Sequence, residues 1–146
     1  SVPDTRRAQS KVGHWQDSAV TALKQCGTPW LPKIAAPETF AAAISAIGGR
    51  EIDLVAGLVG DLKPLSEILR PWHPPVSRDG LRLGLWIGPE GDFSVTEYGR
   101  LATAGIVGIS LGQNVLRSET AAVVGLSRLL YELERCGFRD EKTGNS

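Results

Sequence analysis

Apolar residues recur along several stretches of this chain at the three- and four-residue steps of an amphipathic helix. The pattern predicts a first helix over residues 8–26, closed by Gly27, and an alanine-rich helix that opens at residue 37 and stops at residue 48. A short helical turn is expected at residues 63–70, and a last helix at residues 118–134. The apolar positions expected to face the core from this last helix are Val123, Leu126, Leu130 and Leu133.

Mostly apolar runs between these helices predict strands. Residues 52–59 have the composition of a strand buried on both faces of a parallel sheet. Further strands are expected at residues 81–87 and 106–111, and residues 32–36 indicate a short edge strand. Because helices and strands alternate, we expect an α/β fold with a parallel sheet.

Composition indicates one domain with a sizeable core, since 42% of the 146 residues are apolar. We expect this domain to span residues 1–138 and to be followed by a polar tail, residues 139–146. No apolar run approaches the roughly 20 residues of a membrane span, and the first residues lack a signal pattern. The expected location is therefore the cytoplasm or an organelle matrix, without a membrane partner. Cys26 and Cys136 lack metal-ligand spacing and are expected to be free thiols.

Charge excludes attraction of the whole chain to a polyanion, because 16 basic residues balance 16 acidic ones. Any contact with a nucleic acid must then be local. The basic residues that could make it are Arg6, Arg7, Lys11, Arg70, Arg78, Arg82 and Arg117. The alternative for each is an ordinary solvated side chain.

Two glycine-marked turns, residues 87–94 and 111–118, each follow a predicted strand and lead into a helix. In the first, Ser94 and Glu97 have the spacing of a capping box, and Phe93 and Tyr98 that of a hydrophobic staple. In the second, the expected N-cap is Ser118. Because parallel strands end at the same edge of a sheet, both turns are expected there, where ligands of open α/β folds bind.

The two turns favour a neutral or cationic ligand. Phosphate-binding motifs of the GxxxxGK[ST] and GxGxxG types are absent, and the carboxylates of Glu90 and Asp92 disfavour a diphosphate. Gly88 and Gly91 leave room for a flat ring. The residues that would add an apolar wall are Leu111, Val115 and Leu116. The alternative is that both turns are ordinary loops before capped helices.

The two turns also carry a family resemblance. Residues 87–97, IGPEGDFSVTE, and residues 111–121, LGQNVLRSETA, resemble the C-terminal half of the RsmE family, bacterial 16S rRNA uracil-N3 methyltransferases of the SPOUT class. Upstream, residues 22–27 and 32–34 resemble the family's "QCG … P.I" stretch. The resemblance implies a SPOUT methyltransferase domain with a C-terminal trefoil knot that binds S-adenosylmethionine, usually as a homodimer. Relatives carry an N-terminal PUA-like domain, then a first strand and helix, ahead of the region that Ser1 matches.

The resemblance also implies roles for single residues. The first cofactor loop would include Leu58 and Gly60, where the match is loose because the family often has a proline in this loop. The residues of the other two loops would be Ile87, Gly88, Pro89, Glu90 and Gly91, then Leu111, Gly112, Val115 and Leu116. In the second loop, Asp92 replaces a commoner glycine.

Arg117 is the candidate catalytic residue, as a group that holds the uracil or a phosphate and stabilises negative charge on the ring. The alternative is that Arg117 has a structural role, in which it pairs with Glu119 or another carboxylate and locks the knot. Neither His14 nor His73 lies in these motifs, so the sequence identifies no proton acceptor.

The implied function is methylation of N3 of a uridine in small-subunit ribosomal RNA, with that RNA or the small ribosomal subunit as partner. Two alternatives come from other classes. One is a non-catalytic homodimeric module that binds S-adenosylmethionine or RNA, and the other is a structural dimerisation domain.

Overall fold

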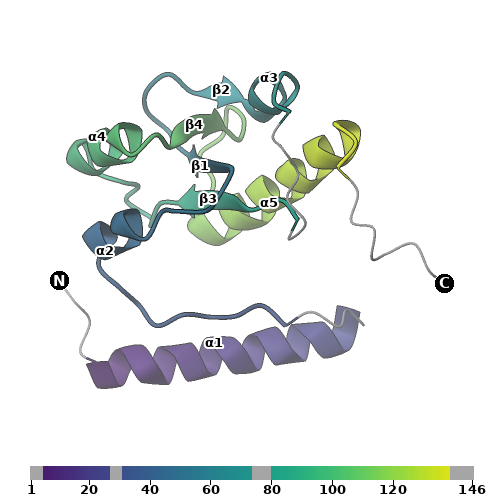
Figure 1. Ribbon diagram of the computed structural model, residues 1–146. Helices are drawn as coiled ribbons and strands as arrows, with labels where there is room; N and C mark the ends of the chain where they lie inside the picture. The colour runs from purple at the N-terminus through teal and green to yellow at the C-terminus, as the bar shows by residue number, and fades with distance from the viewer. Residues whose placement is uncertain (1–4, 27–30, 74–79, 139–146) are drawn as a thin grey trace. The chain divides into compact units, whose positions relative to one another are not determined.

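The computed structural model describes residues 5–26, 31–73 and 80–138, with the side chains of residues 5–8 and 26 left out of the description. The chain divides into two compact units, Ser1–Ile47 and Gly48–Ser146. Figure 1 traces both along the chain. The predicted tail at residues 139–146 and Arg78 lie outside the described residues, as do the side chains of Arg6, Arg7 and Cys26.

The first unit contains two helices, α1 (Thr5–Cys26) and α2 (Phe40–Ser45). The Thr39 hydroxyl caps α2 by accepting a hydrogen bond from the Ala42 amide. The edge strand predicted at residues 32–36 is wrong, because this segment is irregular. Prolines at positions 32 and 37 remove amide donors at both ends of the segment, which disfavours pairing with a strand.

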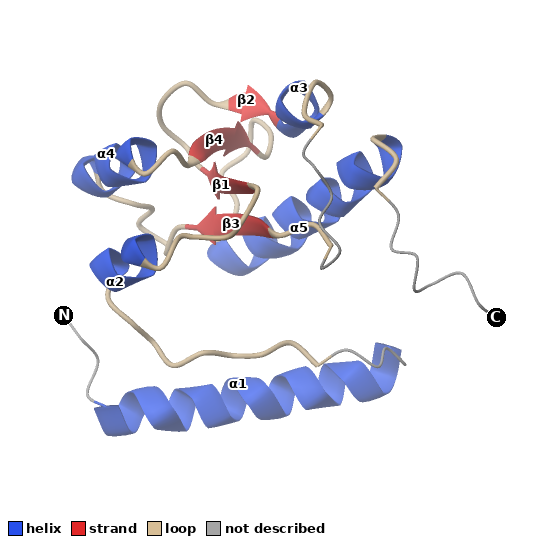
Figure 2. Ribbon diagram, viewed as in Figure 1, coloured by secondary structure: helices blue, strands red, loops and turns tan. Residues whose placement is uncertain are grey.

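The second unit is built on a parallel sheet of β1 (Ile52–Ala56), β2 (Lys63–Pro64), β3 (Leu83–Ile87) and β4 (Val107–Ser110). The strand order is β2-β4-β1-β3, as Figure 2 shows in red. All three pairings are parallel, so the predicted α/β class with a parallel sheet is confirmed. β1 ends at Ala56, whereas the predicted strand runs on to residue 59.

The main core lies on one face of this sheet, against α3 (Leu65–Leu69) and α5 (Ser118–Arg135). Its buried residues are Leu54, Leu65, Leu69, Ile109, Leu129 and Leu133. Successive side chains of a strand point to opposite faces. Val55 accordingly lies on the other face, where it shares a cavity with Leu101 of α4 (Val95–Thr103). Helices therefore cover both faces of the sheet, and the strand ends stay open.

The core-facing stripe predicted for the last helix is wrong at three of its four positions. Leu133 is buried, but Val123, Leu126 and Leu130 are exposed. The buried face of α5 consists of Gly125, Leu129 and Leu133. The cause is Gly125, which lets the helix approach the sheet so closely that an added Cβ would lie 3.0 Å from Leu85. The more apolar stripe of α5 is left on the surface.

The predicted start of α4 is confirmed in detail. The Ser94 hydroxyl accepts a hydrogen bond from the Glu97 amide, and the Glu97 carboxylate accepts one from the Ser94 amide. The hydrogen bonds that the Ser94 amide and the Ser94 hydroxyl donate to the Glu97 carboxylate lower the pKa of Glu97 below its usual value. The hydrophobic staple is formed as an edge-on contact of the Phe93 and Tyr98 rings, with centroids 5.7 Å apart.

The start of α5 differs from the prediction. Its N-cap is Arg117, which makes no side-chain capping hydrogen bond, and Ser118 is already helical. The Ser118 hydroxyl instead donates a hydrogen bond to the carbonyl oxygen of Gly88, at 2.8 Å. A tertiary contact between two loops has taken the place of the local cap.

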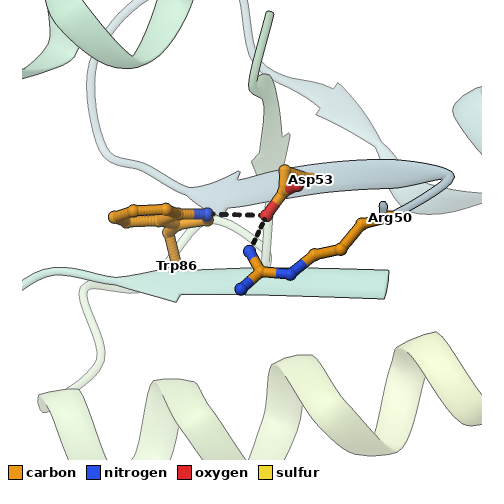
Figure 3. Close-up of polar contacts among 3 residues, drawn as sticks. All are labelled: Arg50, Asp53 and Trp86. Atoms are coloured by element: carbon orange, nitrogen blue, oxygen red, sulfur yellow. Dashed lines mark hydrogen bonds and ion pairs between the residues drawn. The ribbon is translucent and has the colours of Figure 1, made fainter. Parts of the chain in front are cut away.

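Among the described residues of this unit, Asp53 is the one buried charged side chain. Its carboxylate accepts hydrogen bonds from Arg50 (2.7 Å) and from the indole nitrogen of Trp86 (3.0 Å), as Figure 3 shows. Asp53 pairs in register with Gly84 of β3, where an added Cβ would collide with the Asp53 carboxylate. The cluster holds the amino end of β1 against β3, at the edge of the sheet opposite the predicted site.

Candidate functional site

The strand register brings three loops to one edge of the sheet. Ala56, the last residue of β1, pairs with Ile87 of β3 and with Ile109 of β4. β3 ends at the same level, and β4 ends one residue beyond it. The loops that follow these strands, residues 57–62, 88–94 and 111–117, therefore begin side by side. This is the edge at which the sequence predicts a ligand.

A pocket lies between these loops and the first turn of α5. Its lining combines backbone-rich positions, apolar side chains and acidic groups. The lining residues are Ala56, Gly57, Leu58, Ile87, Gly88, Pro89, Glu90, Asp92, Leu111, Gly112, Asn114, Val115, Leu116, Ser118 and Ala121.

Most of the predicted cofactor residues meet in this pocket; the exceptions are Gly60 and Gly91. Gly60 lines a different cavity, between the sheet and α4. Gly91 lies in the turn closed by the hydrogen bond from the Asp92 amide to the Pro89 carbonyl, where it is exposed. The binding roles of these residues stay predictions.

Hydrogen bonds fix the loop that follows β4. The Ser110 hydroxyl accepts a hydrogen bond from the Gly112 amide at 3.2 Å. Gly112 has a φ of 119°, in the region that favours glycine, so the chain can turn sharply there. Together with the Ser118–Gly88 contact, this holds residues 111–117 against the loop after β3.

A tyrosine connects the other two loops. Tyr98 of α4 donates its hydroxyl hydrogen to the Asp92 carboxylate, whose two oxygens both lie 2.8 Å away. The same hydroxyl oxygen accepts a hydrogen bond from the Leu58 amide at 3.4 Å. Burial, the hydrogen bond to Asp92 and the charge of Asp92 together raise the pKa of Tyr98 to about 12. The hydroxyl therefore stays protonated near neutral pH and remains a donor.

The charge of the pocket favours a cation. Among the described residues that line it, Glu90 and Asp92 are acidic and none is basic. Coulomb repulsion would work against a phosphate-rich ligand here, as the sequence predicts.

Arg117 lies at the rim of the pocket and does not line it. It is exposed, between Leu116 and Ser118, which do line the pocket. No ion pair joins Arg117 to Glu119 in the described part of the chain. The salt bridges of the described residues likewise join Arg117 to no other carboxylate, and its side chain is exposed beside the pocket.

The sequence prediction lacks some of the residues that line the pocket, namely Ala56, Gly57, Asn114, Ser118 and Ala121. It names Asp92 as a charge of the turn but not as a cofactor-binding residue. Ala56 and Gly57 could have been found only by placing the end of β1 at Ala56. Ala121 lies in the first turn of α5, where its orientation depends on how the helix packs.

The described residues contain no group of three or more histidine, cysteine or acidic side chains that could hold a metal ion. His14 and His73 are both exposed, outside the pocket. No helix in the described part of the chain combines the length and the apolar character that crossing a membrane requires.

Comparisons with known proteins identify the family of this chain. The family model of the RNA methyltransferase domain matches residues 1–130. Ribosomal RNA small subunit methyltransferase E of Synechocystis is 30% identical over 128 residues, which cover 87% of this chain and 41% of that protein. This chain thus spans less than half the length of that relative.

Solved structures share the fold. A putative methyltransferase from Legionella pneumophila, in complex with SAM, is similar with a TM-score of 0.75 and 28% identity, over 90% of this chain and 50% of that one. The ribosomal RNA small subunit methyltransferase E of Neisseria gonorrhoeae, bound to S-adenosyl methionine, gives a TM-score of 0.70 at 23% identity, over 85% and 49% of the two chains. Since the family model covers most of the sequence, the chain belongs to the RNA methyltransferase family.

Proposed function

We propose that this chain is a methyltransferase domain that binds S-adenosylmethionine and methylates N3 of a uridine in small-subunit ribosomal RNA. The observation that carries the proposal is the meeting of three loops, after β1, β3 and β4, in one acidic, backbone-rich pocket. Family membership and the SAM-bound structural relatives support the choice of cofactor.

The residues of the pocket fit this cofactor. Leu111, Val115 and Leu116 offer an apolar wall for an adenine ring, and the loop backbones offer donors and acceptors for its edge. The carboxylates of Glu90 and Asp92 suit a ligand that carries a sulfonium and an ammonium group. When bound, S-adenosylmethionine would supply an activated methyl group.

Arg117 would act on the RNA side of the pocket. Its exposed guanidinium could donate to the oxygens of a uracil or to a phosphate, and would stabilise the negative charge that develops on the ring as N3 loses its proton. The base must be unpaired before N3 is accessible. The location that follows from a ribosomal substrate is the cytoplasm.

The proposal includes two features that the resemblance to RsmE implies, a trefoil knot and a homodimer. Support for the knot comes from the hydrogen bond of Ser118 to Gly88, which fixes the start of α5 on the loop after β3. Support for the dimer comes from the exposed apolar stripe of α5, which includes Leu126 and Leu130.

The first test is calorimetric titration of the chain with S-adenosylmethionine. We expect micromolar binding that is lost in Val115→Trp, because this residue lines the pocket yet is 76% exposed and can be enlarged without disturbing the core. The matched control is Val95→Trp, at an 86% exposed position of α4 outside the pocket, which should bind like wild type. A folded wild-type chain that binds no cofactor would contradict the proposal.

The second test is transfer of labelled methyl groups to small ribosomal subunits, with the modified nucleoside identified by mass spectrometry. Arg117→Ala should lower kcat on the order of 100-fold, with S-adenosylmethionine affinity unchanged. Arg100→Ala, an exposed arginine on α4, is the control. Full activity of Arg117→Ala would overturn the catalytic role, and cofactor binding without transfer by wild type would favour the non-catalytic module.

A further inference from the structure

Tyr98 lies where the loop after β1 meets the loop after β3. Its hydroxyl bonds to Asp92 in one loop and to the Leu58 amide in the other. Its ring contacts Phe93 edge-on. Leu58 and Asp92 both line the pocket, whereas Tyr98 itself does not.

Close packing shows that this arrangement is built for the tyrosine. A Cβ added to Gly57 would lie 3.0 Å from the Tyr98 hydroxyl oxygen and 3.2 Å from its ring. A Cβ added to Gly88 would lie 2.6 Å from the Asp92 carboxylate. The two glycines therefore leave the space that the Tyr98 ring and the Asp92 side chain occupy.

Asp92 adopts its position at a conformational cost. Its φ of 60° makes it the one non-glycine residue of the described chain with a positive φ. A glycine would adopt this turn more easily. If only the turn mattered, an aspartate would bring no benefit, but its carboxylate is the acceptor for Tyr98.

The loop after β1 is anchored at both ends and exposed between them. The Gly57 amide donates a hydrogen bond to the Ile109 carbonyl at 3.2 Å, and the half-buried Leu62 lies against Gly108 of β4. Leu58 is 54% exposed and Val59 is 64% exposed, so little apolar burial holds the segment between these anchors. The hydrogen bond from the Leu58 amide to Tyr98 adds an anchor within this exposed segment.

We propose that Tyr98 and Asp92 are positioning residues, which hold the loop after β1 at a fixed distance from the loop after β3 and so shape the cofactor pocket. Tyr98 acts through the backbone of Leu58, and Asp92 acts by orienting the tyrosine hydroxyl. The inference rests on the proposed function for the identity of the ligand, and on the contacts alone for the bridge between the loops.

The binding test compares four variants and a control by titration with S-adenosylmethionine. Tyr98→Phe should weaken binding about tenfold, the factor expected for loss of one hydrogen bond to a charged group. Asp92→Gly should weaken binding at least as much, because it also removes a carboxylate from the pocket. Asp92→Asn keeps an acceptor for the hydroxyl and should bind more tightly than Asp92→Gly. The double variant Tyr98→Phe/Asp92→Gly should be no weaker than Asp92→Gly alone, because both changes remove the same bridge. Tyr131→Phe, at the only other tyrosine, is the matched control.

A kinetic comparison separates positioning from catalysis. In methyl transfer, Tyr98→Phe should raise KM for S-adenosylmethionine about tenfold and leave kcat within about twofold of wild type. An equal fall in kcat and in kcat/KM would place the tyrosine in the chemical step and overturn the assignment.

Amide hydrogen exchange tests the bridge without any ligand. Exchange at Leu58 should accelerate about tenfold in both Tyr98→Phe and Asp92→Gly, with Ile109 in the core unchanged. Unchanged exchange at Leu58 in Tyr98→Phe would overturn the bridge, whatever the chain binds. Faster exchange at Leu58 in the two variants would support the bridge even if the wild-type chain fails to bind S-adenosylmethionine. That failure would contradict the proposed function instead. Faster exchange with unchanged cofactor affinity would overturn the effect on the pocket.

Discussion

A single buried carboxylate illustrates how one residue can fix the pairing of two strands. Asp53 is nearly inaccessible to solvent, and burial of an unpaired charge is costly. The cost is offset because Arg50 and Trp86 both donate to one carboxylate oxygen. Gly84, opposite Asp53 in the register, provides the space. A one-residue slip of β3 would place Leu83 or Leu85 opposite Asp53 in place of Gly84.

Asp53→Ala should lower the free energy of unfolding by about 2–3 kcal/mol, because it removes the charged acceptor that Arg50 and Trp86 share. Urea unfolding followed by circular dichroism measures the change. Asp53→Asn, which keeps an acceptor, should cost less. Asp17→Ala, at an exposed position of α1, should cost nearly nothing, and an equal loss there would contradict the explanation.

The pKa of Tyr98 gives a prediction at alkaline pH. In a Tyr131→Phe background, Tyr98 is the only tyrosine, and its absorbance near 295 nm should titrate with a midpoint at about 12. Because the folded-state pKa lies above the ordinary value of 10, the free energy of unfolding should fall as pH rises from about 10 to 12. Asp92→Gly should lower the pKa, though burial keeps it above the ordinary value. A midpoint near 10 in the folded chain would contradict the buried hydrogen bond.

Helix α5 has two apolar faces, and its sequence does not say which of them packs on the sheet. The buried face carries Gly125, Leu129 and Leu133, and the exposed one carries Val123, Leu126 and Leu130. At 3.6 residues per turn, the two faces lie roughly 100° apart around the helix axis. The choice depends on Gly125, which allows the closest approach to Leu85. A leucine stripe outweighs a glycine in any hydrophobic pattern, so periodicity alone selects the wrong face.

Gly125→Leu should destabilise the second unit by about 1–3 kcal/mol, because the new side chain would overlap Leu85 and press on Leu111. Since Leu111 lines the pocket, affinity for S-adenosylmethionine should fall as well. Gly99→Leu is the matched control, as a helical glycine with nothing within 4 Å of an added Cβ. It should be neutral or stabilise by up to about 1 kcal/mol. Thermal unfolding of the two variants decides between these outcomes.

For the molecule as a whole, the exposed stripe of α5 and the proposed homodimer give one prediction. The stripe of Val123, Leu126 and Leu130, together with the neighbouring Tyr131, is the largest group of exposed apolar side chains on one described helix. In a dimer these residues would be buried against a second copy.

Sedimentation velocity should therefore show a dimer for wild type and a monomer for Leu126→Asp/Leu130→Asp, since burying two carboxylates in an apolar interface is costly. Val95→Asp, an exposed apolar position on α4, should remain dimeric. A monomeric wild-type chain at micromolar concentration would refute the dimer.

Much of the fold could be predicted from local signals. The apolar runs at β1, β3 and β4 indicated parallel pairing, which the structure has. Ser94 with Glu97 marked the start of α4, because a capping box acts within four residues. The short strand predicted at residues 32–36 failed because the prolines at positions 32 and 37 remove amide donors that a strand pairing needs. Ser118 failed as a cap because its hydroxyl bonds to a carbonyl thirty residues away in the sequence.

The sequence by itself determined most of the helices and strands, the parallel sheet and the edge at which the pocket lies, because these depend on periodicity, on turn chemistry and on the rule that parallel strands end together. Most of the lining residues follow from the family resemblance of the loops. Only the tertiary structure decided which face of α5 is buried, that Gly60 turns away from the pocket, and that Tyr98 joins Leu58 to Asp92. These features depend on how closely backbones approach one another. That distance is set by all the packed side chains together, and no short stretch of sequence contains it.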